Sequence, residues 1–375
     1  MDLLPLNRTD VQVGMEARFD IFDANGNKLL SKGVLVTSES MSERLLERGR
    51  RRSQEGDASV RAGGRESWVA ATTVFAKLEA FSLELAGLHE ALIQARGSSI
   101  GKSLHGLAAR LIGCFEADQD GLLAALQIGS DHDTAATRMV HVCILSELIS
   151  SRLSLSEQER TAIRVAALTY DVGMHAMRDE LSAHAGELNQ GQQDRLRTHP
   201  DLTVEILARA GIDDAYWLEL VHSHHERIDG SGYPRGLLEA QITRPMRILA
   251  LADIYSAMIR PRVYREALNA REAMRSIFLE RGRLVDPELA AILVKALGIY
   301  PPGSFVRLAS GEIAVVVART ENANVPELRS VVSIEGMARA VPVPRDPQES
   351  GFAIIGEVRA SGCRFPMAPI RKLWK

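Results

Sequence analysis

Residues 224–234 read HHERIDGSGYP, which places two adjacent imidazoles, two carboxylates, a guanidinium and a glycine-rich turn in one short segment. The apolar run at 215–221 is typical of a helix, and both histidines can point inward if that helix ends before them. Neutral imidazole is the commonest metal ligand. The turn at 229–232 supplies positive-φ freedom and free backbone N–H groups, which suit an anionic ligand. The segment therefore predicts a metal site beside an anion-binding turn, rather than a solvated surface loop.

The composition restricts the class of protein. The 375 residues are enough for two or three domains with a large core. Lys and Arg total 45 against 48 Asp and Glu, a net charge of −3, so we expect neither a DNA nor a membrane partner. Three widely spaced cysteines form no disulfide framework or zinc motif, and no run of 18 apolar residues occurs. These features predict a soluble, cytoplasmic protein.

The first fifty residues are expected to form a small β-rich module. Apolar residues alternate over 11–21, and Asn25-Gly26 separates them from a second apolar run at 29–36, which is a strong hairpin signal. A short helix is expected at 38–48, and the polar, glycine-rich segment 49–66 is typical of a linker. We interpret the module as a docking or dimerisation piece, so a homodimer is an open alternative.

The middle of the chain is expected to be helical. Ser156 followed by Glu159 marks a capping box at one helix start. Apolar residues recur at helical spacing from residue 67 to about 129, with a break near 97–101. The same periodicity continues over the segments 134–153, 156–168, 190–210 and 213–222.

The pattern of residue types changes after Pro301-Pro302, where short runs of β-branched and aromatic residues are separated by glycine and proline. This pattern predicts an antiparallel β module. The expected organisation is a β-rich module at 1–48, a linker at 49–66, a helical connector at 67–115, a helical domain at 116–298 and a β module at 299–375.

The segment HHERxDGxGYP, followed by Gly236-Leu237, resembles the signature of the HD-GYP family. These are metal-dependent phosphodiesterases of the HD superfamily that open the cyclic dinucleotide c-di-GMP. The resemblance covers roughly residues 116–300, and its many fixed positions make it far more specific than a lone glycine motif. It implies a mainly α fold, with a helical HD-GYP-like core flanked by the two β modules.

The resemblance implies five metal-ligand positions in this chain. Asp171, His199, His224, His225 and Asp253 match ligands of the family in its order and near its spacing. Asp171 matches the carboxylate that bridges two metal ions, and it is also the candidate catalytic residue. We expect these five side chains to meet in one pocket.

Two further ligand positions depart from the family pattern. Thr137 and Tyr170 stand where the family has histidines, and Met174 stands for a lysine. The first metal of the family would keep only Asp171 and Asp253 of its four ligands, whereas the second would keep its aspartate and three histidines. This implies one divalent transition metal, Fe, Mn, Zn or Ni, rather than two.

The resemblance also implies a nucleotide-binding surface. Arg262 and Arg265 lie in a motif that binds phosphates in the family, a role that suits the planar guanidinium group. The residues expected to contact the nucleotide are Arg227, Asp229, Gly232, Tyr233, Arg262 and Arg265.

Two functions of different class follow from this pattern. The first is a degenerate HD-GYP protein that binds c-di-GMP or docks a partner, such as a diguanylate cyclase, with weak or no hydrolysis. The second is an active metal-dependent c-di-GMP phosphodiesterase. Hydrolysis of another phosphate ester is a third alternative, because fold does not fix function.

Overall fold

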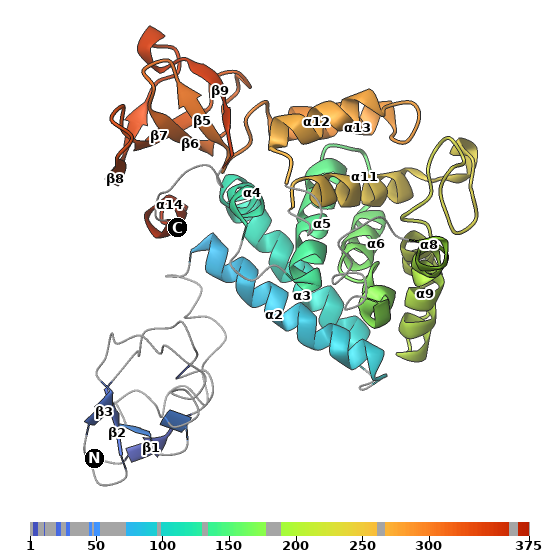
Figure 1. Ribbon diagram of the computed structural model, residues 1–375. Coiled ribbons are helices and arrows are strands. Elements are labelled where there is room, and N and C mark those ends of the chain that lie inside the picture. Colours follow the sequence, from blue (N-terminus) through green and yellow to red (C-terminus); the bar gives the residue numbers. More distant parts are fainter. Residues whose placement is uncertain are drawn as a thin grey trace. The chain divides into compact units, whose positions relative to one another are not determined.

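The computed structural model divides the chain into two compact units, Met1–Ala71 and Thr72–Lys375. Figure 1 shows the ribbon of both units. The structure describes residues 3–6, 11, 20–23, 28–30, 45–46, 49–52, 73–95, 99–129, 134–177, 189–260, 267–359 and 367–374.

The first unit is built on an antiparallel sheet with the strand order β1-β4-β2-β3. Its strands are β1 (Leu3–Pro5), β2 (Ile21–Phe22), β3 (Lys28–Leu30) and β4 (Arg50–Arg52). Strands β2 and β3 pair across the expected hairpin, whose turn lies outside the described residues, as does most of the helix expected at 38–48.

Strand β4 corrects the expected start of the linker. We predicted a linker from residue 49, but Arg50–Arg52 pair with β1 on one side and with β2 on the other. The prediction failed because it rested on polar side chains, whereas a sheet is held by main-chain hydrogen bonds that any residue other than proline can make. The other expected domain boundaries remain predictions.

The second unit is mainly helical (Figure 1). Its helices are α2 (Val74–Ile93), α3 (Ile100–Ala117), α4 (Gln119–Ile128), α5 (Ala135–Ser150), α6 (Glu157–Ala167), α8 (Gln190–Arg197), α9 (His199–Arg209), α10 (Ala215–His222), α11 (Arg244–Met258), α12 (Ala270–Leu279) and α13 (Pro287–Leu297), with short 3₁₀ turns η3 (Val172–Met177), η4 (Glu239–Gln241) and η5 (Ser350–Phe352). None of the described helices is long and apolar enough to cross a membrane.

Helix α5 lies at the centre of this unit. Nearly all of its residues are buried, and it packs against α2, α6 and α11. A helix that is buried on every side belongs to the core. Its buried Glu147 pairs with Arg160 and Arg164 of α6, and Nε of Arg164 donates to Oε2 of Glu147 at 2.7 Å. The expected capping box of Ser156 and Glu159 is confirmed at the start of α6.

The segment 190–210, expected as one helix, is two helices. Helix α8 ends at Arg197, and α9 begins at His199 with Pro200 in its first turn. Proline has no N–H to continue the preceding helix but fits the first turn of a new one. The break sets His199 at a helix start instead of a helix interior.

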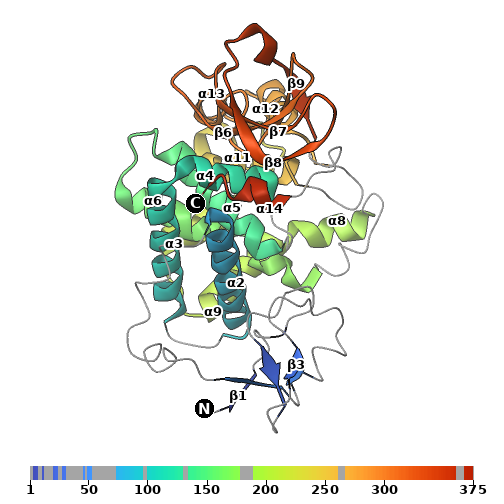
Figure 2. The same cartoon turned by 90° about the vertical axis from the view of Figure 1, so that its left-hand side faces the viewer.

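The C-terminal β module is confirmed as an antiparallel sheet with the order β8-β7-β6-β5-β9. Its strands are β5 (Phe305–Leu308), β6 (Ile313–Ala318), β7 (Glu327–Val332), β8 (Ala338–Arg345) and β9 (Ile354–Val358), and helix α14 (Met367–Arg371) follows. Figure 2 shows this module next to α12 and α13. Nε of Arg319 donates to Asp120 of α4 at 2.5 Å, which ties the sheet to the helical core.

Candidate metal centre

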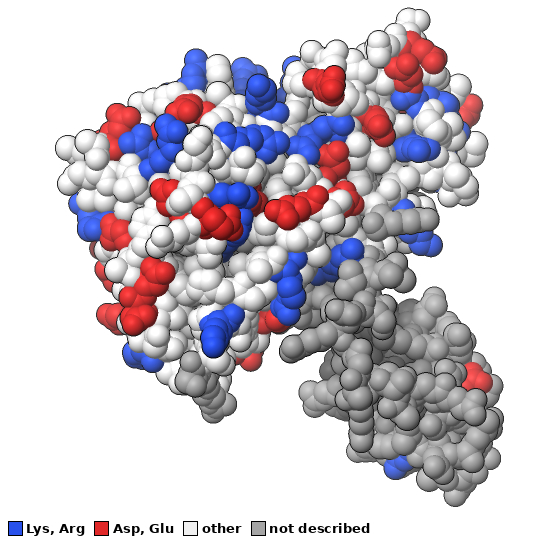
Figure 3. Space-filling model, turned by 180° about the vertical axis from the view of Figure 1, so that it is seen from behind, with Lys and Arg blue, Asp and Glu red and all other residues white. Residues whose placement is uncertain are grey.

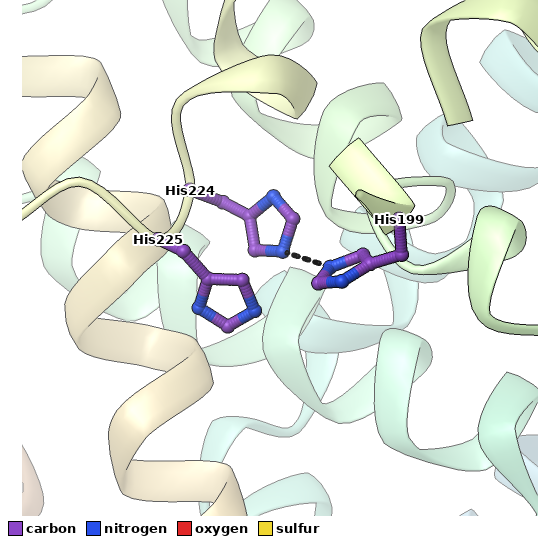
Figure 4. A group of neighbouring side chains, drawn as sticks. All are labelled: His199, His224 and His225. Atoms are coloured by element: carbon purple, nitrogen blue, oxygen red, sulfur yellow. Dashed lines mark hydrogen bonds between the residues drawn. The ribbon is translucent and has the colours of Figure 1, made fainter. Parts of the chain in front are cut away.

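Three histidines from two segments of the chain form one cluster (Figure 4). His199 begins α9, while His224 and His225 follow the end of α10 at His222. One ring nitrogen of each residue lies within 4.8 Å of one nitrogen of both others. His199 and His224 are almost completely buried, and His225 is half-buried. The structure therefore brings three of the five expected ligand residues together in one group that could hold a metal ion.

The hydrogen bonds of two rings fix their tautomers. Nδ1 of His199 donates to the Leu196 carbonyl oxygen at 2.6 Å, and Nδ1 of His224 donates to the Val221 carbonyl oxygen at 2.6 Å. The hydrogen of each neutral ring is thereby placed on Nδ1, so both Nε2 atoms carry lone pairs. These two atoms lie 3.1 Å apart (Figure 4), close to the ~3.3 Å that separates two nitrogens at about 2.0–2.1 Å from a tetrahedral zinc ion.

The surroundings keep the imidazoles of His224 and His225 neutral. Burial, together with the neighbouring His199, lowers the pKa of His224 to about 3. Burial, together with His224 and His199, also holds the pKa of His225 well below its usual range. Because only the neutral ring can ligate a metal, His224 and His225 are ready to bind one without losing a proton.

Asp171 approaches the cluster from the turn that precedes η3. Its Oδ1 lies 3.5 Å from Nε2 of His199. The contact depends on Gly173, whose N–H donates to the Thr203 hydroxyl, which in turn donates to the His199 carbonyl oxygen. A Cβ at position 173 would lie 2.5 Å from that carbonyl oxygen, so only glycine permits this approach of η3 and α9.

The glycine-rich loop is fixed by Glu226. This buried carboxylate accepts hydrogen bonds from the backbone N–H groups of Arg235 and Leu237, both at 2.8 Å. A Cβ on Gly232 would lie 2.4 Å from the Arg227 backbone nitrogen, so the loop closes on itself only with glycine there. The ring of Tyr233 consequently stands 4.6 Å from that of His225, centroid to centroid.

The side chains expected to contact the nucleotide differ in whether other residues of the chain already bind them. Nη1 of Arg227 donates to the Glu226 carbonyl oxygen, and Asp229 accepts hydrogen bonds from the backbone and hydroxyl of Ser231. Arg235, another cation that could contact phosphate, is paired with Glu219 at 2.6 Å. Arg262 and Arg265 lie outside the described residues. Figure 3 shows positive and negative side chains interspersed over the described part of one face.

A carboxylate pair lies beside the histidine cluster and is joined by Arg138. Nη2 of Arg138 donates to Oδ1 of the buried Asp253 at 2.5 Å, and its Nη1 lies 3.5 Å from Oδ2 of Asp171. The fully buried Tyr170 donates its hydroxyl to the same Oδ1 of Asp253 at 2.7 Å. Burial raises the pKa of Tyr170, so it stays a neutral phenol rather than a phenolate ligand. Thr137 bonds to Thr134 in the capping box of α5.

Sequence reasoning missed Arg138. Matching the sequence to a ligand motif shows which metal ligands are kept or lost. It does not show which side chain supplies positive charge where a metal ion is lost. The available signal was the position of an arginine directly after Thr137, the first substituted ligand, on a helix that is otherwise nearly all buried.

Comparisons with known proteins agree with this fold. The model of the HD domain family matches residues 125–289. A protein from Pseudomonas aeruginosa named cyclic di-GMP phosphodiesterase is 32% identical over 62% of this chain and 56% of its own length. A response regulator of Xanthomonas campestris, also named cyclic di-GMP phosphodiesterase, is 34% identical over 42% of this chain and 41% of its length.

A third relative, from Vibrio cholerae, is named a 3'3'-cGAMP-specific phosphodiesterase and is 31% identical over 43% of this chain and 35% of its length. The chain thus spans about half or less of the length of these three relatives.

A solved structure has a similar fold. It is an HDGYP protein from Bdellovibrio bacteriovorus, with a TM-score of 0.54 and 15% identity over 79% of this chain and 99% of that chain. Residues 125–289 thus match the HD domain family, the fold is similar to that of an HDGYP protein, and relatives of the chain are named cyclic di-GMP phosphodiesterases.

Proposed function

We propose that this chain is a cyclic-di-GMP signalling protein of the HD-GYP type, with one divalent transition metal ion and weak or no hydrolysis. The observation that carries the proposal is the contrast between two neighbouring groups. The histidine cluster presents two Nε2 atoms that lie 3.1 Å apart, whereas the carboxylates beside it are already bound by Arg138 and Tyr170.

The metal ion would be held by His199, His224, His225 and Asp171, and it would act as a Lewis acid on a phosphoryl oxygen. Three imidazole nitrogens and one carboxylate oxygen suit Fe, Mn, Zn or Ni. Asp253, expected from the sequence as a fifth ligand, shares one oxygen with two donors. We therefore assign Asp253 to the carboxylate pair and not to the metal.

Weak hydrolysis follows from this arrangement. Phosphodiester cleavage by a two-metal clamp stabilises both the attacking and the leaving oxygen. Tyr170 is a neutral hydrogen-bond donor, and the Thr137 hydroxyl is engaged with Thr134, so neither would contribute a ligand to a second ion. The remaining groups would orient a bound phosphate better than they would cleave it.

The nucleotide would lie over the glycine-rich loop, which carries Arg227, Asp229, Gly232 and Tyr233, and the ring of Tyr233 lies beside that of His225. The assignment of Arg262 and Arg265 to its phosphates remains a prediction. A partner protein such as a diguanylate cyclase is the other occupant that we propose for this surface.

The second candidate is an active c-di-GMP phosphodiesterase, in which water is added across one phosphodiester bond to open the ring. It is favoured by the relatives, because those with 31–34% identity are named as phosphodiesterases for c-di-GMP or 3'3'-cGAMP.

The test uses the full chain loaded with Fe(II) or Mn(II) and mixed with c-di-GMP. Calorimetry measures binding, and chromatography of the nucleotide measures cleavage. We expect binding with turnover on the order of a thousandfold below that of the Pseudomonas aeruginosa relative, the rate equivalent of about 4 kcal/mol. Rapid cleavage that Asp171→Ala abolishes would favour the second candidate, and the absence of both binding and cleavage would reject c-di-GMP as the ligand.

A further inference from the structure

The carboxylates of Asp171 and Asp253 come from different parts of the chain and share one cation. Asp171 lies in the turn before η3, Asp253 lies on α11, and the guanidinium of Arg138 reaches both from the first turn of α5. Both carboxylates are buried. Two neighbouring buried negative charges are stable only if a positive charge compensates them.

One oxygen atom of Asp253 is occupied by this arrangement. Its Oδ1 accepts one hydrogen bond from Arg138 at 2.5 Å and a second from the Tyr170 hydroxyl at 2.7 Å. A divalent ion that bound the same oxygen would have to displace both donors. It would also stand next to the guanidinium, whose positive charge repels it.

We propose that Arg138 is the resident cation of this carboxylate pair, and that it excludes a second divalent ion from the position beside the histidine cluster. The chain would then carry one metal ion in the histidine site and one fixed organic cation next to it. This inference goes beyond the proposed function, because it concerns metal occupancy and holds whatever nucleotide the protein binds.

Guanidinium differs from a metal ion in what it can do there. It is planar, stays protonated and donates hydrogen bonds, but it has no open coordination position for water. Asp253 and the other nearby acidic groups outweigh the effect of burial and raise the pKa of Arg138, so its charge is permanent. Arg138 would therefore keep the negative charge of the carboxylates balanced without adding a second Lewis acid.

The experiment measures metal stoichiometry after equilibrium dialysis of the full chain against Mn(II), with elemental analysis and electron paramagnetic resonance as readouts. We expect one ion per wild-type chain, one in Arg138→Lys, and a second ion in Arg138→Met. The second ion should bind at least tenfold more tightly than any second ion in the wild type. It should also give the spectrum of a spin-coupled pair, because ions in two-metal sites lie roughly 3.5–4 Å apart.

The matched control is Arg164→Met, which removes another buried arginine from a carboxylate, Glu147, on the neighbouring helices. This variant should still bind one ion, because a general loss of stability does not create a metal site. Two ions in the wild type would overturn the inference, as would a folded Arg138→Met protein that still binds only one. A wild-type count of two would reject the inference even if Arg138→Met fails to fold. A protein with one ion but no affinity for c-di-GMP would reject only the proposed ligand.

Discussion

Nε2 of His199 lies 3.1 Å from Nε2 of His224, although each ring already gives its Nδ1 hydrogen to a main-chain carbonyl oxygen. Two lone pairs at this distance repel unless a proton or a metal ion lies between them. The carbonyls that fix the rings belong to Leu196 and Val221, each three residues before its histidine. The local backbone thus aims both nitrogens at one point before any ion is bound.

The ring of His225 should strongly affect the affinity for the metal ion. We expect His225→Ala to weaken Mn(II) or Zn(II) binding by on the order of a hundredfold or more, since even loss of an outer-shell partner costs 10–100-fold. Calorimetric titration measures the change. His222→Ala is the control, because His222 is close in sequence but pairs with the exposed Asp201. Equal affinities of the two variants would exclude His225 as a ligand.

Gly173 should control the site through the backbone. Gly173→Ala would place a Cβ 2.5 Å from the His199 carbonyl oxygen, which forces η3 and α9 apart. We expect a loss of about 1–3 kcal/mol in the free energy of unfolding, as for overpacking, together with weaker metal binding.

The control for this change is Gly106→Ala on the exposed face of α3, where a Cβ meets nothing within 4 Å. It should stabilise the chain by about 0.5–1 kcal/mol, because alanine favours a helix over glycine. Urea unfolding of both variants provides the comparison. If Gly173→Ala proved as stable as the wild type, the close approach would not constrain the site.

The sequence predicted the helical core and the histidine cluster because both depend on local patterns. Helical periodicity identified α5 and α6, and the HHERxDGxGYP segment identified His224 and His225. Arg138 could not be found in this way, since its bond to Asp253 joins residues 115 positions apart. Strand β4 was missed for a similar reason, because its pairing partners lie far from Arg50–Arg52 in the chain.

Restoring the family's ligands should require removal of the arginine. We expect the double variant Thr137→His with Tyr170→His to bind one metal ion while Arg138 is kept. Addition of Arg138→Met should allow a second ion and raise c-di-GMP cleavage on the order of a thousandfold, the effect of several kcal/mol from a second Lewis acid. Elemental analysis and product chromatography test the two steps separately. A second ion in the double variant would show that Arg138 does not block the position.

The junction between β9 and α12 should make stability depend on pH. Glu357 is partly buried and accepts a hydrogen bond from the Arg271 backbone N–H at 3.3 Å, in the first turn of α12. Burial raises the pKa of Glu357 to about 6, and the negative charge of Glu272 acts in the same direction. The folded state therefore prefers the protonated carboxyl group. Its contribution to stability is complete below the unfolded pKa of about 4.3 and is lost as the pH rises through about 6.

The variant Glu357→Gln stays neutral at every pH, so it should keep this contribution. We expect its free energy of unfolding, relative to the wild type, to rise by on the order of 1 kcal/mol between about pH 5 and about pH 7.5. Urea unfolding at the two pH values measures this difference, and the titration of the histidines cancels because both proteins contain them. Glu349→Gln, at an exposed position of the same module, should follow the wild type at both pH values. If the free energies of unfolding of Glu357→Gln and the wild type changed in parallel with pH, Glu357 would not titrate in this range. The start of α12 would then stabilise its carboxylate more strongly than burial destabilises it.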